Sequence, residues 1–214
     1  MKTLLQINSS LFSSGGQSSR LADAFVLEWR AAHPDGRTVV RDLAADPVPH
    51  LTAERFGGFV AKPEDRSAAQ ADAVAFSDAL IDELRAADTL VIGLPMYNFG
   101  VPSTLKAYFD HVARAGVTFR YGAAGPEGLL TGKKAYVFAA RGGLYSGTPL
   151  DTQTAYVRDF LGFIGIADVE FVYAEGLAMG DAAKAAAIED AAAAARSLAH
   201  GRVRAPAVAR SLAA

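Results

Sequence analysis

The segment "GLPMYNFGVP", residues 93–102, places four large side chains of different chemistry next to one another: Met96, Tyr97, Asn98 and Phe99. Turns are normally built from Gly, Asn, Asp, Ser or Pro, which hydrogen-bond locally or accept unusual backbone angles. A loop made of a thioether, a phenol, an amide and a phenyl ring predicts instead that a flat molecule lies against it.

A second candidate, "NSSLFSSGGQSSR" at 8–20, holds six serines and two glycines directly ahead of a predicted helix. The first N–H groups of a helix are unpaired and carry partial positive charge, so this segment could bind a phosphate. The alternative is a flexible polar loop with an ordinary serine cap at Ser18. The dinucleotide fingerprint GxGxxG is absent, and "GLLTGKK" at 128–134 does not have Walker spacing. The two candidates together favour a mononucleotide with a flat ring.

A third segment, "AARGGLYSGTP" at 139–149, follows another apolar run. Gly142 and Gly143 permit positive φ, so consecutive N–H groups there could form a nest that faces an anion. The alternative is a plain turn after a strand. Phe119, Tyr121 and Tyr145 lie in glycine-rich surroundings, and we interpret them as lining a substrate pocket.

Other chemistries find little support in the sequence. The chain has no cysteine, which removes disulfides, thiolate nucleophiles and Cys-ligated metals. Its histidines at 33, 50, 111 and 200 lack metal-ligand spacing, so no metal site is predicted. Ser146 does not sit in a GxSxG elbow, and Asp110 and Glu127 are interpreted as solvated or capping carboxylates. No side chain is predicted to act as a catalytic acid, base or nucleophile.

Composition bounds the partners of the protein. Hydrophobic residues make up 51% of the 214 and charged residues 21%, which is typical of a globular domain. A formal net charge of -2 without basic blocks argues against nucleic acid as a partner. No apolar run approaches the ~18 residues of a membrane helix, and the first ten residues do not resemble a signal peptide. We therefore expect a cytoplasmic protein that does not bind membranes.

The three candidate loops need elements that bring them together. Short apolar runs rich in β-branched or aromatic residues predict five strands, at 3–7, 38–43, 88–94, 134–140 and 168–174. Helical periodicity predicts five helices, at 18–33, 66–87, 102–115, 152–164 and 181–199. We expect Pro102 in the first turn of the third helix, where its missing N–H costs nothing.

Alternating strands and helices indicate an α/β fold with a parallel sheet. Five strands fit a flavodoxin-like three-layer sandwich of strand order 2-1-3-4-5, with helices on both faces. That order brings the carboxyl ends of strands 1, 3 and 4 to one edge, together with the loops that follow them. We expect one domain over 1–200, long excursions at 44–65 and 116–132, and a frayed tail at 201–214.

Several stretches carry a family resemblance: "PMYNF" (95–99), "LKAYFDHVARAGVTFRY" (105–121), "GPEGLLTGKKAYV" (125–137), "RGG" (141–143) and "FLGFIGIADVEFVYAEG" (160–176). In these the chain resembles the FMN-dependent NADH-azoreductases, of the NADH:quinone oxidoreductase group within the flavodoxin-like superfamily. The resemblance implies bound FMN, NADH as electron donor, and a homodimer with both active sites at its interface. It implies reduction of quinones and cleavage of azo compounds. Because residues 96–99 would cover one face of the flavin, both substrates are expected to use the other face in turn, by ping-pong hydride transfer.

The resemblance also assigns residues to the cofactor. The residues that match the family's phosphate loop are Ser10, Gln17 and Ser18. Those that match the segment along the flavin are Met96, Tyr97, Asn98 and Phe99. Those that match the loop near the polar edge of the ring are Arg141, Gly142 and Gly143. Two positions depart from the family pattern, because Gly16 and Ala140 each stand where a serine is often found.

Two rival functions belong to other classes. A flavodoxin-type carrier of single electrons would normally present an acidic face, which a net charge of -2 with mixed signs does not favour. A non-catalytic nucleotide-binding module would leave the aromatic excursions without a purpose. NADH oxidation measured with and without a quinone separates the three.

Overall fold

The computed structural model describes residues 1–200, and the predicted tail 201–214 lies outside the described residues. Five parallel strands form the central sheet in the order β2-β1-β3-β6-β7: β1 (Thr3–Asn8), β2 (Arg37–Asp42), β3 (Thr89–Pro95), β6 (Lys134–Ala140) and β7 (Asp168–Ala174). By count this is the predicted order 2-1-3-4-5, which is confirmed. The central strands β3 and β6 are buried along almost their whole length, which explains their continuous apolar sequences.

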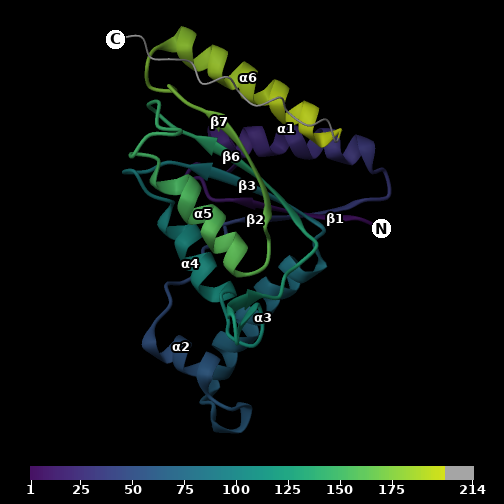
Figure 1. Cartoon of the computed structure of the whole chain (residues 1–214), viewed down its shortest axis with the longest axis vertical. Coiled ribbons are helices and arrows are strands. Elements are labelled where there is room, and N and C mark those ends of the chain that lie inside the picture. The colour runs from purple at the N-terminus through teal and green to yellow at the C-terminus, as the bar shows by residue number, and fades with distance from the viewer. Residues whose placement is uncertain (201–214) are drawn as a thin grey trace.

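Helices cover both faces of the sheet, as predicted (Figure 1). One face carries α1 (Gln17–Ala32) and α6 (Asp181–Ala199), and the other carries α3 (Ala68–Ala86), α4 (Ser103–Val112) and α5 (Thr152–Phe163). Each face has its own apolar core. Prominent members are Phe25, Trp29 and Leu198 under α1 and α6, and Leu80, Phe109 and Leu161 under the other three helices.

Strand register brings the loops of interest to one edge. Asn8 pairs with Gly93, Pro95 with Ala140, and Ala140 with Ala174, so β1, β3, β6 and β7 end close to one another. Gly93 allows α1 to cross close to β3, because a Cβ there would lie 3.3 Å from the Ser18 backbone. The segments after these four strands therefore share the carboxyl edge of the sheet.

The two long excursions hold regular structure that the sequence analysis did not predict. Segment 44–65 contains α2 (Ala53–Val60) and a short 3₁₀ turn (Pro63–Asp65). Segment 116–132 contains an antiparallel pair, β4 (Phe119–Gly122) and β5 (Gly125–Gly128). In Figure 1, α2 lies beyond α3 and far from the sheet.

Two predicted helix starts need correction. Gly16, not Ser18, is the N-cap of α1, and Ser18 lies buried in the first turn. Pro102 is the N-cap of α4 rather than a first-turn residue. Both shifts are small. They matter for Ser18 because its N–H is now one of the unpaired donors in the first turn of the helix.

Candidate functional site

The loop after β1 ends at a helix start that is suited to an anion. A 3₁₀ turn (Ser13–Gly15) precedes α1, and Gly16 offers no side-chain cap. The N–H groups of Gln17, Ser18 and Ser19 have no acceptor within residues 1–200. The hydroxyls of Ser18 and Ser19 are buried and equally lack a partner there. A phosphate would supply the acceptors that these donors need.

Gly16 fits this loop for a steric reason. A Cβ at position 16 would overlap the Ser10 side chain, so a serine cannot stand here while Ser10 keeps its place. Gly16 therefore packs directly against the Ser10 side chain in this structure. The Ser10 hydroxyl is used locally, since it accepts from Phe12 N–H at 3.2 Å.

The segment after β3 forms a tight turn with strained backbone. Tyr97 and Gly100 are hydrogen-bonded in both directions, with N···O distances of 3.3 and 2.9 Å. The two residues between them, Asn98 and Phe99, have φ of 49° and 62°. Such turns normally contain Asn-Gly, and a left-handed phenylalanine costs roughly 1–2 kcal/mol. Phe99 is nevertheless 49% exposed, so core packing does not explain the strain.

This turn is held from beneath by the start of α5. The Gln153 side chain is fully buried, and its Nε2 donates to the carbonyls of Pro95 and Gly100, both at 2.9 Å. Thr152 Oγ1 donates to the carbonyl of Phe99. The carbonyl of Pro95 at the end of β3 and those of Phe99 and Gly100 in the turn are therefore fixed. The side chains of Asn98 and Phe99 are exposed.

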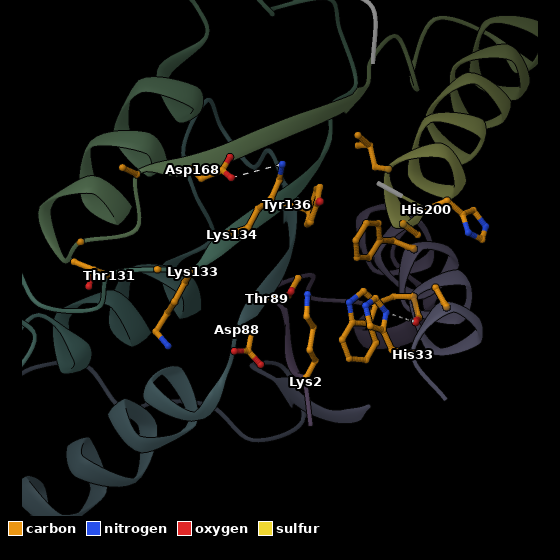
Figure 2. A pocket seen from close by; sticks show the side chains of 18 residues that line it. Lys2, His33, Asp88, Thr89, Thr131, Lys133, Lys134, Tyr136, Asp168 and His200 are labelled. Carbon is orange, nitrogen blue, oxygen red and sulfur yellow. Dashed lines mark hydrogen bonds and ion pairs between the residues drawn. The ribbon is translucent and has the colours of Figure 1, made fainter. Parts of the chain in front are cut away.

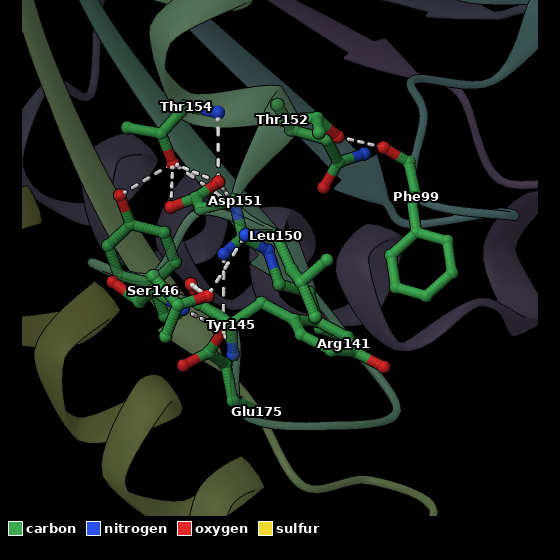
Figure 3. A network of polar contacts seen from close by, with 12 residues as sticks. Phe99, Arg141, Tyr145, Ser146, Leu150, Asp151, Thr152, Thr154 and Glu175 are labelled. Carbon is green, nitrogen blue, oxygen red and sulfur yellow. Dashed lines mark hydrogen bonds and ion pairs between the residues drawn. The ribbon is translucent and has the colours of Figure 1, made fainter.

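The Arg141 side chain points into the protein rather than toward the edge (Figure 3). Its guanidinium donates to Asp151 at 2.7 Å and to Glu175 at 3.1 Å, and it stacks over the Tyr173 ring at 4.9 Å. Burial raises the pKa of Asp151, but hydrogen bonds from Arg141 and Thr154 outweigh burial and lower that pKa overall. The Arg141 N–H is engaged as well, because it donates to the Ala174 carbonyl at 2.9 Å, so position 141 offers no free backbone donor to a cofactor.

The glycines of this third loop keep their N–H groups available. The carbonyls of Gly142 and Gly143 accept from Ala178 and Gly176, both at 3.0 Å, while their own N–H groups have no acceptor among residues 1–200. Glu175 Oε1 also accepts from the N–H groups of Tyr145 and Ser146, at 2.9 and 2.8 Å. The carboxylate thus fixes the loop, and the free N–H groups suit the oxygen edge of a ring.

The three loops touch one another. Ser10 Oγ lies 3.3 Å from the Tyr97 hydroxyl, and Leu11 N–H donates to the same hydroxyl at 3.2 Å. The rings of Phe99 and Tyr145 meet edge to face at 5.6 Å. The structure therefore brings together these residues predicted from the sequence: Ser10, Gln17, Ser18, Met96, Tyr97, Asn98, Phe99, Gly142, Gly143 and Tyr145.

Phe119 and Tyr121 lie elsewhere in the same chain. Phe119 is only 8% exposed and packs on Phe163 at 4.3 Å, at the far end of α5, whereas Tyr121 is 76% exposed. Since Thr152 at the start of α5 contacts Phe99, the helix length separates Phe119 from the turn by roughly 16 Å. Within one chain these two rings do not join the three loops.

Exposed apolar side chains surround the candidate site. Five residues on the loops of the carboxyl edge are each more than half exposed: Leu11, Phe12, Leu144, Leu150 and Met179. We call these five the apolar rim. Exposed apolar side chains gathered on loops of one edge are typical of a place where an apolar ligand or a protein surface binds.

A cavity of about 1010 Å³ lies at the opposite, amino edge of the sheet (Figure 2). Its lysines are largely used inside the protein. Lys133 Nζ donates to the carbonyls of Arg85 and Ala87, and Lys134 Nζ lies 3.6 Å from the Asp168 and Glu170 carboxylates. The carboxyl edge, where unpaired donors meet exposed rings, is the better candidate.

No helix within residues 1–200 has the length and hydropathy needed to cross a bilayer. A family model described as a flavodoxin-like fold matches residues 1–199.

Curated relatives match at high identity over most of the chain. One from Cellvibrio japonicus is 56% identical over 180 residues, covering 84% of this chain and 90% of its own length. Another, from Burkholderia thailandensis, is 57% identical over 191 residues, covering 89% and 96%. Both carry the name FMN-dependent NADH:quinone oxidoreductase.

Solved structures also match closely. An azoreductase from Bacillus anthracis str. Sterne has a TM-score of 0.87 at 29% identity and covers 94% of this chain and 100% of its own. An FMN-dependent NADH-azoreductase from Bacillus anthracis str. Ames Ancestor, solved in complex with FMN, has a TM-score of 0.82 at 25% identity, with 93% and 100% covered.

Proposed function

The chain belongs to the FMN-dependent NADH:quinone oxidoreductases of the flavodoxin-like fold, and we propose that it passes two electrons from NADH to quinones and azo compounds through FMN. The observation that carries the proposal is the contact between Ser10 and Tyr97. It joins a helix start with unpaired donors to a turn with exposed rings, as one ligand with a phosphate and a flat ring requires.

The residues present fit FMN. The N–H groups and hydroxyls at the start of α1 would hold the phosphate, the 96–99 turn would lie along the ring, and the N–H groups of Gly142 and Gly143 would face its oxygen edge. When bound, FMN supplies the hydride chemistry. The protein positions the ring, and the proton that the acceptor takes up beside the hydride can come from solvent, so no acid or base is required from a side chain.

Ser18→Ala should weaken FMN binding by roughly 1–2 kcal/mol, the scale of a hydrogen bond to a charged group. Segment 8–19 contains no Lys or Arg, so hydroxyls and amides must balance the phosphate charge. Fluorescence titration of the apoprotein with FMN measures the effect. An unchanged dissociation constant would move the phosphate to another part of the chain.

We further propose a ping-pong mechanism. With the 96–99 turn along one side of the ring, NADH and the acceptor, both flat, must use the same open side in succession. NAD⁺ then leaves before the acceptor binds, and double-reciprocal plots at several fixed acceptor concentrations should be parallel. Intersecting lines would require a ternary complex and would exclude this mechanism.

Stoichiometry gives a second test of the activity. The purified protein should be yellow and release about one FMN per chain on denaturation. Full cleavage of an azo bond to two amines takes four electrons, so two NADH should be consumed per azo bond and one per quinone. A colourless protein that FMN does not reconstitute, or one that releases FAD, would overturn the assignment. The apolar rim at the candidate site favours an enzyme over a flavodoxin-type carrier.

We propose that the active unit is a homodimer. The five side chains of the apolar rim are each more than half exposed in one chain, and the exposed ring of Tyr121 lies too far from its own 96–99 turn to serve it. A second chain could cover the rim and bring its own Phe119 and Tyr121 to the pocket. Light scattering should give twice the chain mass of 22.4 kDa at micromolar concentration.

A further inference from the structure

The first turn of α5, "DTQT" at 151–154, contacts both of the loops that would hold the FMN ring. On one side, Gln153 and Thr152 donate to the carbonyls of Pro95, Phe99 and Gly100. A side-chain amide can serve two carbonyls at once only through its NH₂ group, so the orientation of Gln153 is determined by its partners. Gln153 Oε1 has no partner within residues 1–200, so the polar contacts of this side chain there are the two hydrogen bonds that Nε2 donates.

On the other side, Asp151 reaches the third loop through a short chain of contacts (Figure 3). Asp151 accepts from Arg141 at 2.7 Å and from the N–H of Thr154 at 3.1 Å, and so caps α5. Arg141 in turn donates to Glu175, whose Oε1 accepts from Tyr145 and Ser146 N–H. The helix cap and the glycine loop are thus parts of one network.

We infer that the first turn of α5 is a positioning element that fixes both ring-binding loops, with Gln153 as its central residue. The inference rests on the proposed function. Its physical basis is the left-handed pair Asn98 and Phe99, since strained backbone persists only where the surroundings determine it. Gln153 and Thr152 hold three carbonyls of that turn, and no other side chain within residues 1–200 donates to them.

The test compares FMN affinity with the two-electron midpoint potential of the bound flavin. Gln153→Met keeps the length and volume of the side chain and removes both donors. It should raise the FMN dissociation constant roughly tenfold, as expected for two lost hydrogen bonds that act in part on the ligand. It should also shift the potential, because the turn lies along the ring. Ser18→Ala should raise the dissociation constant and leave the potential unchanged, since Ser18 faces the phosphate end.

Asp159→Asn is the matched control, an exposed carboxylate on the same helix, and should match wild type in both measurements. Thr152→Val tests the same turn from an exposed position where folding is not at risk, with an expected loss of roughly threefold in affinity and a shift in potential. If Gln153→Met fails to fold, as judged by circular dichroism, Thr152→Val decides the question alone.

The outcomes are distinct. A folded Gln153→Met protein with wild-type affinity, or with lower affinity at an unchanged potential, would overturn the inference and leave the proposed function intact. A wild-type protein that binds no FMN would overturn the proposed function and this inference with it. Lower affinity together with a shifted potential supports it.

Discussion

Gly16 shows how a single residue determines the packing of the loop after β1. A side chain at position 16 would overlap Ser10, so Gly16→Ser should displace Ser10, disturb its contact with Tyr97 and raise the FMN dissociation constant roughly tenfold. The double variant Ser10→Gly/Gly16→Ser removes the overlap and should recover part of the affinity. Titration of the three apoproteins measures this. Equal losses in the single and double variants would contradict the steric explanation.

Asp151 should make stability depend on pH in the acid range. Its pKa in the folded protein lies below the ordinary value of 3.8, so its ion pair contributes fully above that value and is lost as pH falls through the folded pKa. Asp151→Asn should therefore lower the free energy of unfolding at pH 7 by roughly 2–4 kcal/mol, because Arg141 stays buried with one partner fewer.

The difference between Asp151→Asn and wild type should narrow below about pH 3.8. Urea unfolding between pH 3 and 7 measures both proteins, with the exposed Asp159→Asn as control. A difference that stays constant over this range would mean that the Asp151 charge does not stabilise the fold.

Residues that belong to recognisable local patterns could be predicted from the sequence. Residues whose role depends on a partner far away in the chain could not. The 96–99 quartet and the serine loop stand out because their composition is unusual for turns. Gln153 does not, because its role comes from a carbonyl 58 positions earlier. Glu175 likewise acts on Tyr145, 30 positions away. The resemblance matched Arg141 to the loop near the polar edge of the ring, whereas two carboxylates hold its side chain inside the protein.

At the level of elements, the turn between β3 and α4 keeps Phe99 in a strained left-handed conformation in which its ring is half exposed. Phe99→Gly should stabilise the apoprotein by about 1 kcal/mol, since glycine adopts the left-handed conformation at little cost. The same variant should weaken FMN binding, because the ring is lost and the turn becomes more mobile. Thermal unfolding of the apoprotein and FMN titration give the two numbers. A destabilised apoprotein would mean that Phe99 packs rather than strains.

Elements with clear periodicity were predictable, and those formed by tertiary contact were not. All five sheet strands follow from short apolar runs, and most helix limits fall within two residues of the prediction. Helix α2, "AERFGGFV", holds two glycines in eight residues, a composition that disfavours a helix on its own. It is held by packing on α3 and by Phe59, which lies under the Arg114 guanidinium at 5.0 Å and beside the buried ring of His111.

At the level of the whole molecule, the sequence predicted that three loops lie at one edge of the sheet but did not predict where the β4–β5 pair lies. In a parallel sheet the carboxyl ends of all strands lie at the same edge, so the strand order determines which loops lie next to one another. The β4–β5 pair follows no such rule. Its position depends on the packing of Phe119 against Phe163, which no periodicity encodes.

A mixed dimer can decide whether Tyr121 serves its own site or that of a second chain. The first variant, Gly16→Ser, disturbs the loop after β1, and the second, Tyr121→Ala, removes the exposed ring. A homodimer of either variant should be impaired in quinone reduction. Co-expression with two different tags and tandem purification yields the mixed dimer. If Tyr121 acts on the partner chain, one of its two sites carries both substitutions and the other carries neither, so activity should return to about half of wild type. If Tyr121 acts within its own chain, each site keeps one substitution and no activity returns. The roughly 16 Å between Phe119 and the 96–99 turn predicts the first result.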